Sequence, residues 1–145
     1  KMMITFHRMP NVCAAFVLEQ FRSISPLNDI RRRLAGIYAK AARAGDWSMP
    51  RAALDATVLQ KFPVYARDAT RLRMALKREQ IYLDDGWHGA VVNPLSVDQA
   101  GAGYAKGMCP VSEDIAKHIV TLPLHPTMLP EQAQYLVHAV RSFLA

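Results

Sequence analysis

The chain has 145 residues, of which 51% are hydrophobic and 21% charged, and its formal net charge at pH 7 is +6. The length is that of one domain, and the composition supports a buried core, which excludes a disordered or fibrous chain. The excess of positive charge fits either an anionic ligand or an acidic complement on another domain or partner. The basic residues are dispersed along the chain, so we expect no nucleic-acid partner.

The cysteines and histidines argue against a disulfide-stabilised protein and against a zinc protein. Two cysteines, Cys13 and Cys109, make no disulfide framework, and the five histidines match no zinc-binding spacing. We therefore expect no metal site and a reducing, cytoplasmic setting. No apolar run approaches the roughly 20 residues that cross a bilayer, and no signal peptide is visible, so we expect no membrane partner. Because Lys1 is not methionine, the chain is expected to be processed or part of a longer protein.

The first predicted element is a helix from Val12 to Phe21, with Asn11 as its cap. Its residues are apolar almost all round, and such a helix must be covered on every side. A domain of this size has little interior to hide it, so we expect a second subunit or a missing domain to cover it. Cys13 lies in this run and is expected to be a buried small hydrophobic residue.

Helices and strands follow in alternation. Ser25 followed by Pro26 predicts the start of an amphipathic helix that ends at Gly45. Residues 58–67 alternate like a strand, in which Pro63 favours an edge position or a bulge. Asp68 is expected to cap a helix from 69 to about 79, and residues 81–83 to form a second short strand. This order predicts an α+β fold with a small antiparallel sheet packed with helices and led by a long helical segment.

The last third predicts three more elements. Ser112 is a good cap for a short helix, residues 121–124 form an edge strand that contains Pro123, and a final helix runs over 131–144. His125 is held in extended geometry before Pro126. It is a candidate ligand-binding residue, and the competing interpretation is a structural hydrogen bond to the backbone.

Residues 84–107 are mostly loop, and a loop of this length is usually functional or disordered. Trp87 and His88 within it suggest a stacking platform for a sugar or base, or else a local hydrophobic plug. The sequence contains no glycine-rich phosphate loop, no GxSxG and no HExxH. On spacing alone the chain therefore offers no complete active site and no catalytic residue.

Several short motifs occur in an order that is known from one family. Residues 8–15, RMPNVCAA, resemble the family segment NYRMPNxxAA, and residues 62–83 resemble its strand, helix and strand. The pairs Gly103-Tyr104, Cys109-Pro110, Leu122-Pro123 and His125-Pro126 match its closing motif. The chain thus resembles the C-terminal third of the DegT/DnrJ/StrS family of sugar aminotransferases, which depend on pyridoxal 5'-phosphate (PLP).

The resemblance implies a division of the chain and an activity. Residues 1–45 would be a helical connector from a large domain, and residues 46–145 the small C-terminal α+β domain of a fold-type I aminotransferase. The whole enzyme would move an amino group from an amino acid such as glutamate to a nucleotide-linked keto-sugar, in sugar, polysaccharide or antibiotic biosynthesis. It would be a homodimer joined through helix 12–21 and the large domain.

The resemblance also implies site residues. His7 and Arg8 would contact the cofactor. With a sugar-type substrate implied, Trp87, His88 and His125, which were singled out above from the residues themselves, become the candidates for binding it. The family's asparagine is replaced here by Phe6, which affects the contact that this position makes with the neighbouring subunit's cofactor phosphate. The lysine that holds PLP would lie upstream of Lys1, so this chain would contribute no catalytic residue.

The alternative is a stand-alone, non-catalytic interaction module whose basic surface binds an anionic partner. The apolar helix discriminates between the two, because a free-standing soluble module should not expose it.

Overall fold

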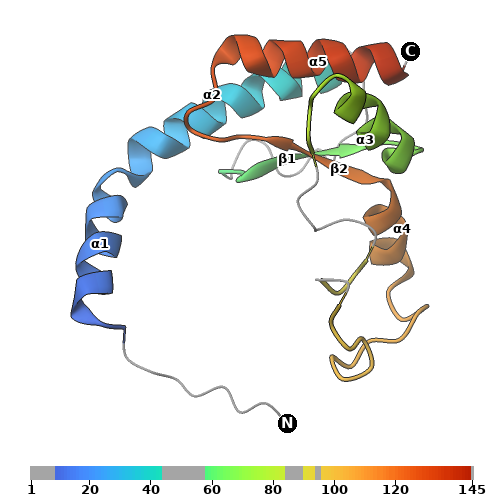
Figure 1. Cartoon of the computed structure of the whole chain (residues 1–145), viewed down its shortest axis with the longest axis horizontal. Helices are drawn as coiled ribbons and strands as arrows, with labels where there is room; N and C mark the ends of the chain where they lie inside the picture. Colours follow the sequence, from blue (N-terminus) through green and yellow to red (C-terminus); the bar gives the residue numbers. More distant parts are fainter. Residues whose placement is uncertain (1–8, 44–57, 84–89, 94–95, 145) are drawn as a thin grey trace.

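The computed structural model describes residues 9–43, 58–83, 90–93 and 96–144. Over these residues the elements occur in the order α1 (Asn11–Arg22), α2 (Ile24–Arg43), β1 (Lys61–Tyr65), α3 (Ala69–Arg78), α4 (Pro110–His118), β2 (Ile119–Pro123) and α5 (Pro130–Leu144). α2 and α5 lie over the two-stranded sheet, while α1 extends away from it (Figure 1). The predicted α+β class is confirmed.

The sheet consists of β1 and β2 in antiparallel register, with Phe62 opposite Leu122 and Val64 opposite Val120. All four of these side chains are at most 1% exposed. Successive side chains of a strand point to opposite faces, so one face of the sheet enters the core. A strand within the predicted range 58–67 is therefore confirmed, although it is shorter.

The expectation of a strand at residues 81–83 is wrong. The backbone N–H of Ile81 donates to the carbonyl of Leu76 at 2.9 Å, which uses it to close the last turn of α3. An amide that completes a helix end cannot also pair with a neighbouring strand. The partner of β1 is instead β2, which overlaps the predicted edge strand at 121–124 but begins at Ile119.

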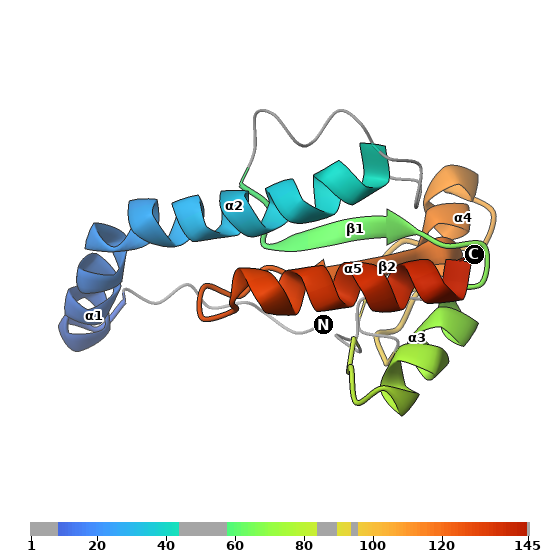
Figure 2. The ribbon, with the colours of Figure 1, turned by 90° about the horizontal axis from the view of Figure 1, so that it is seen from above.

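The core lies between the sheet and the inner faces of α2, α3 and α5, which Figure 2 shows from above. Tyr38 of α2 is fully buried, and its ring centroid is 5.3 Å from that of Phe62. Its hydroxyl donates to the carbonyl oxygen of Pro123 at 3.2 Å. α2 is thereby tied to both strands, as its apolar spacing of three and four residues predicts.

Helix starts were predicted with mixed success. The carboxylate of Asp68 accepts the backbone N–H of Arg71 at 2.8 Å, so the predicted cap of α3 is confirmed. Asn11 and Ser25 are not caps, because α1 and α2 each begin early enough to include them. Ser112 is not a cap either, because Pro110 starts α4, and proline is already set for the first helical position.

α1 is confirmed as a helix, and none of its residues is buried within the chain. Phe16 is 69% exposed and Phe21 is 61% exposed. The expectation that Cys13 is buried is wrong, because its thiol lies exposed on this projecting helix. The predicted end of α2 at Gly45 lies outside the described residues.

Candidate functional site

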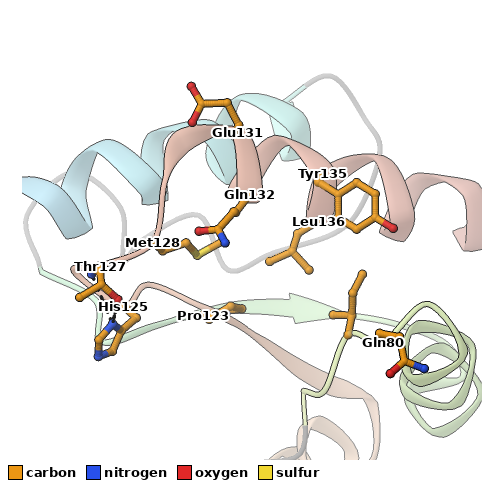
Figure 3. Close-up of a pocket in the computed structure, with 10 residues that line it drawn as sticks. Gln80, Pro123, His125, Thr127, Met128, Glu131, Gln132, Tyr135 and Leu136 are labelled. Carbon is orange, nitrogen blue, oxygen red and sulfur yellow. Dashed lines mark hydrogen bonds between the residues drawn. The ribbon is translucent and has the colours of Figure 1, made fainter.

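A depression of about 700 Å³ opens between α5, the end of β2 and the residues that follow α3 (Figure 3). Its apolar lining comes from four residues, Ile81, Pro123, Met128 and Leu136. Its polar lining comes from six residues, Gln80, His125, Thr127, Glu131, Gln132 and Tyr135. Ligand pockets of about 300–1,000 Å³ usually combine an apolar lining with a few polar groups in this way.

His125 forms part of this groove, and one of its ring nitrogens is already used. Nδ1 lies 2.7 Å from Oγ1 of Thr127 and accepts the backbone N–H of Thr127 at 3.3 Å. An Nδ1 that accepts leaves the proton of a neutral ring on Nε2, which becomes a donor. The structural interpretation of His125 thus holds for Nδ1, while Nε2 remains available to a ligand.

Gln132 and Tyr135 lie one helical turn apart on α5 and add further hydrogen-bonding groups. Oε1 of Gln132 accepts the backbone N–H of Leu129 at 2.9 Å and so helps to begin the helix. Its side-chain amide keeps two N–H donors. Tyr135 is 52% exposed, so its ring offers an apolar surface beside its hydroxyl.

Gln80 sits at the C-terminal end of α3 in an unusual backbone conformation. Its φ is 60°, and among the described residues it is the one non-glycine with positive φ. Its N–H donates to the carbonyl of Lys77 at 3.1 Å, and the next N–H, of Ile81, donates to Leu76. These two bonds form a Schellman motif, in which glycine is the usual residue at this position. A left-handed conformation costs a residue with a side chain roughly 1 kcal/mol.

The described lining of the groove carries no permanent positive charge. Among the described residues no lysine or arginine lines it, and Glu131 supplies a carboxylate. Anion sites in proteins rely on cationic side chains or on the N–H groups of a helix start. Here the chemistry instead favours a neutral ligand with hydroxyl or amide groups.

A second polar cluster organises the start of α4. Oε1 of Glu113 accepts the backbone N–H groups of Gly107 at 2.6 Å and Cys109 at 3.3 Å. These bonds, together with one from the hydroxyl of Tyr104, lower the pKa of the Glu113 carboxyl below its usual value. Desolvation and the same carboxylate raise the pKa of Tyr104. Glu113 therefore holds the turn before α4 as a charged acceptor.

The lowered pKa of Glu113 predicts a loss of stability in acid. A group whose pKa falls on folding stabilises the protein above its unfolded pKa, and this contribution disappears as the pH drops through the folded value. Glu113→Gln keeps an acceptor but does not titrate. We expect the variant to show a weaker dependence of unfolding free energy on pH below about 5, measured by urea denaturation. An unchanged pH profile would contradict this assignment.

A third cluster lies where α4 meets β2. The hydroxyl of Tyr65 donates to Oδ2 of Asp114 at 3.2 Å, and its ring centroid lies 4.9 Å from that of His118. Nδ1 of His118 lies 2.8 Å from the carbonyl oxygen of Asp114. The described part of the chain contains no group of three or more His, Cys, Asp or Glu that could hold a metal.

Of the residues predicted to form sites, only His125 can be placed. Phe6, His7, Arg8, Trp87 and His88 lie outside the described residues. Sequence reasoning missed three groove residues, Gln80, Gln132 and Tyr135. The spacing of Gln132 and Tyr135 on one turn of the last helix was a visible signal, whereas the backbone conformation of Gln80 had none.

The described residues do not fit PLP. The cofactor needs a lysine for its aldehyde and cations or convergent N–H groups for its phosphate. The lysines in the described ranges are all exposed, namely Lys40, Lys61, Lys77, Lys106 and Lys117. None of them lines the groove, so we derive no chemical step through the cofactor from this part of the chain.

Comparisons with known proteins agree with the fold and with the resemblance. A curated relative from Acidithiobacillus ferrooxidans, named UDP-N-acetyl-3-dehydro-alpha-D-glucosamine 3-aminotransferase, is 27% identical over 94% of this chain and 36% of its own length. DesV of S. venezuelae has a similar structure, with a TM-score of 0.75 at 24% identity over 90% of this chain and 35% of its own. A DegT DnrJ EryC1 StrS aminotransferase from Brucella abortus has a TM-score of 0.72 at 23% identity, over 94% and 36%.

The chain thus spans about a third of the length of these relatives. Among the described residues, no helix is long and apolar enough to cross a membrane. The model of one family matches residues 2–141, which is nearly the whole sequence. The chain therefore belongs to the DegT/DnrJ/EryC1/StrS aminotransferase family.

Proposed function

We propose that this chain is the C-terminal portion of a PLP-dependent enzyme that transfers an amino group from an amino acid such as glutamate to a nucleotide-linked keto-sugar. The observation that carries the proposal is the family match over residues 2–141. The name of the curated relative, an aminotransferase for a UDP-linked 3-dehydro sugar, supports this class of substrate. PLP would supply the electron sink for the transfer, and the protein would bind and orient the reactants.

Within this enzyme the proposed division places the connector at residues 1–45 and the small domain at 46–145. His7 and Arg8 would approach the cofactor, with Arg8 as an anion contact. Trp87, His88 and His125 would contact the sugar. The lysine that holds PLP would come from a large domain that precedes this segment.

The proposed enzyme is a cytoplasmic homodimer in which α1 is covered by the large domain and the second subunit. The exposed phenylalanines of α1 support this, because a soluble protein rarely leaves a large apolar patch in water. Glu19 and Arg22 form an ion pair at 2.8 Å, so the helix carries little net charge that would oppose burial. Two exposed free cysteines support a reducing compartment.

The test uses the whole protein that contains this segment, purified from its native source with its mass recorded. Incubated with PLP, L-glutamate and a UDP-linked 3-keto-sugar, it should produce 2-oxoglutarate and the amino sugar in equal amounts. Arg8→Ala should weaken cofactor retention and raise the PLP concentration that activity requires. No transfer to any keto-sugar, together with a native mass of 16.2 kDa, would favour the non-catalytic module instead.

A further inference from the structure

One residue that lines the groove, Gln80, has a positive φ, a backbone conformation that favours glycine. Gln80 occupies the position after α3 at which glycine relieves the strain of a positive φ. Its side chain lies on the rim of the depression, and its Oε1 is 3.4 Å from the hydroxyl of Tyr82. Residues held in unfavourable backbone conformations concentrate at ligand sites. The strain at Gln80 therefore points to a role for its amide in the groove.

The groups around Gln80 define the chemistry that would bind there. Nε2 of His125 and the amide N–H groups of Gln132 can donate, and the carboxylate of Glu131 can accept. The ring of Tyr135 and the apolar lining suit the C–H faces of a ligand. A sugar ring has hydroxyls that both donate and accept around such apolar faces. A phosphate would meet the carboxylate of Glu131, and the described lining residues include no lysine or arginine to offset its charge.

We propose that this groove binds an uncharged sugar ring, with Gln80, Gln132 and Tyr135 acting beside His125. The proposal rests on the proposed function for the kind of ligand, and it adds binding residues that the family resemblance does not name. None of the described lining residues is a lysine that could hold PLP, so sugar binding in the groove is tested without PLP or an amino donor.

The experiment is a titration of the 145-residue chain with N-acetyl-D-glucosamine, followed through its backbone amide NMR signals. We expect saturable shifts that cluster at the end of α3, at residues 123–128 and on the first two turns of α5. D-glucose 6-phosphate should bind at least about tenfold more weakly, because its charge meets Glu131 without a compensating cation.

Gln80→Gly is the decisive variant, because it removes the amide while giving the backbone the residue that it favours. We expect a thermal midpoint at or above that of the parent and binding weakened about tenfold, as the loss of a hydrogen bond to the sugar predicts. Gln134→Ala is the control, since Gln134 is an exposed glutamine on α5, the helix that carries Gln132 and Tyr135, and it is not among the lining residues of the groove. It should bind as the parent does.

Three results would overturn the groove proposal. They are an absence of shifts at about 10 mM sugar, unchanged binding by Gln80→Gly, and equal binding of the phosphorylated sugar. None of them involves transamination, so the groove can fail while the whole enzyme still transfers an amino group. Conversely, binding by the chain together with an inactive whole protein would refute the proposed function alone.

Discussion

Phe62→Ala should lower the free energy of unfolding by about 3–5 kcal/mol, the range measured when a buried phenylalanine is truncated in a well-packed core. Phe62 is fully buried on the inner face of β1, opposite Leu122 and against the ring of Tyr38. Its removal leaves a cavity lined by both strands and α2, which the short sheet cannot close by relaxing. A domain has roughly 5–15 kcal/mol of stability in total, so the substitution should remove a large share of it and shift the urea midpoint well below that of the parent.

The matched control is Phe16→Ala, which makes the same chemical change on α1. Phe16 is 69% exposed, so truncation removes almost no packing within the chain. Alanine also has the highest helix propensity, so α1 itself should not weaken. Urea denaturation monitored by circular dichroism at low protein concentration measures both variants. Equal losses for the two substitutions would mean that Phe62 is not in the core.

The predictions that succeeded depend on local periodicity. The helices predicted from apolar residues at spacings of three and four bury those same residues. Leu34 and Tyr38 of α2, Leu72 and Leu76 of α3, and Val140 of α5 are all at most 2% exposed. A helix buries one stripe of its surface, so the stripe is visible in the sequence before the partner is known. Alternate residues of β1 are likewise buried, because one face of the strand enters the core, and this pattern too is visible in the sequence.

The pairing of strands could not be predicted with the same success. Residues 81–83 have the composition of a strand, and they follow a helix at the usual distance. The backbone N–H of Ile81 instead donates a hydrogen bond to the carbonyl of Leu76 and so completes the end of α3. Leu83 is buried although it pairs with no strand among the described residues. The real partner, β2, begins 54 residues after the end of β1. Which of two short apolar segments pairs with a strand is a question of tertiary contacts, which local propensity does not answer.

The candidate site was only partly visible for a related reason. His125 stood out because a proline follows it, and a rare residue beside a rigid one is easy to notice. Gln80 and Gln132 look like ordinary surface glutamines in the sequence. Their significance depends on a positive φ at one and on a hydrogen bond from Leu129 at the other. Both features arise from how α3 and α5 end and begin, and neither is encoded by residue type.

α1 is the feature that connects this chain to the rest of a proposed dimer. Val12, Phe16, Leu18 and Phe21 are each about 60% exposed or more, and they point to more than one side of the helix. Burying each phenylalanine would contribute roughly 1.5–3 kcal/mol, so the helix is a large potential source of association energy. In the absence of a large domain, the surface available to α1 is a second copy of the same chain.

The purified chain should therefore self-associate, and replacing Phe16 and Phe21 together with alanine should weaken this strongly. Losing roughly 4 kcal/mol of association energy corresponds to about a thousandfold increase in the dissociation constant. Analytical ultracentrifugation over a range of concentrations measures the change. Met74→Ala is the control, since Met74 is 58% exposed on α3, away from α1, and should leave association unchanged. A parent chain that stays monomeric at high concentration would show that α1 is not a contact between copies, and an equal effect of Met74→Ala would show that association is nonspecific.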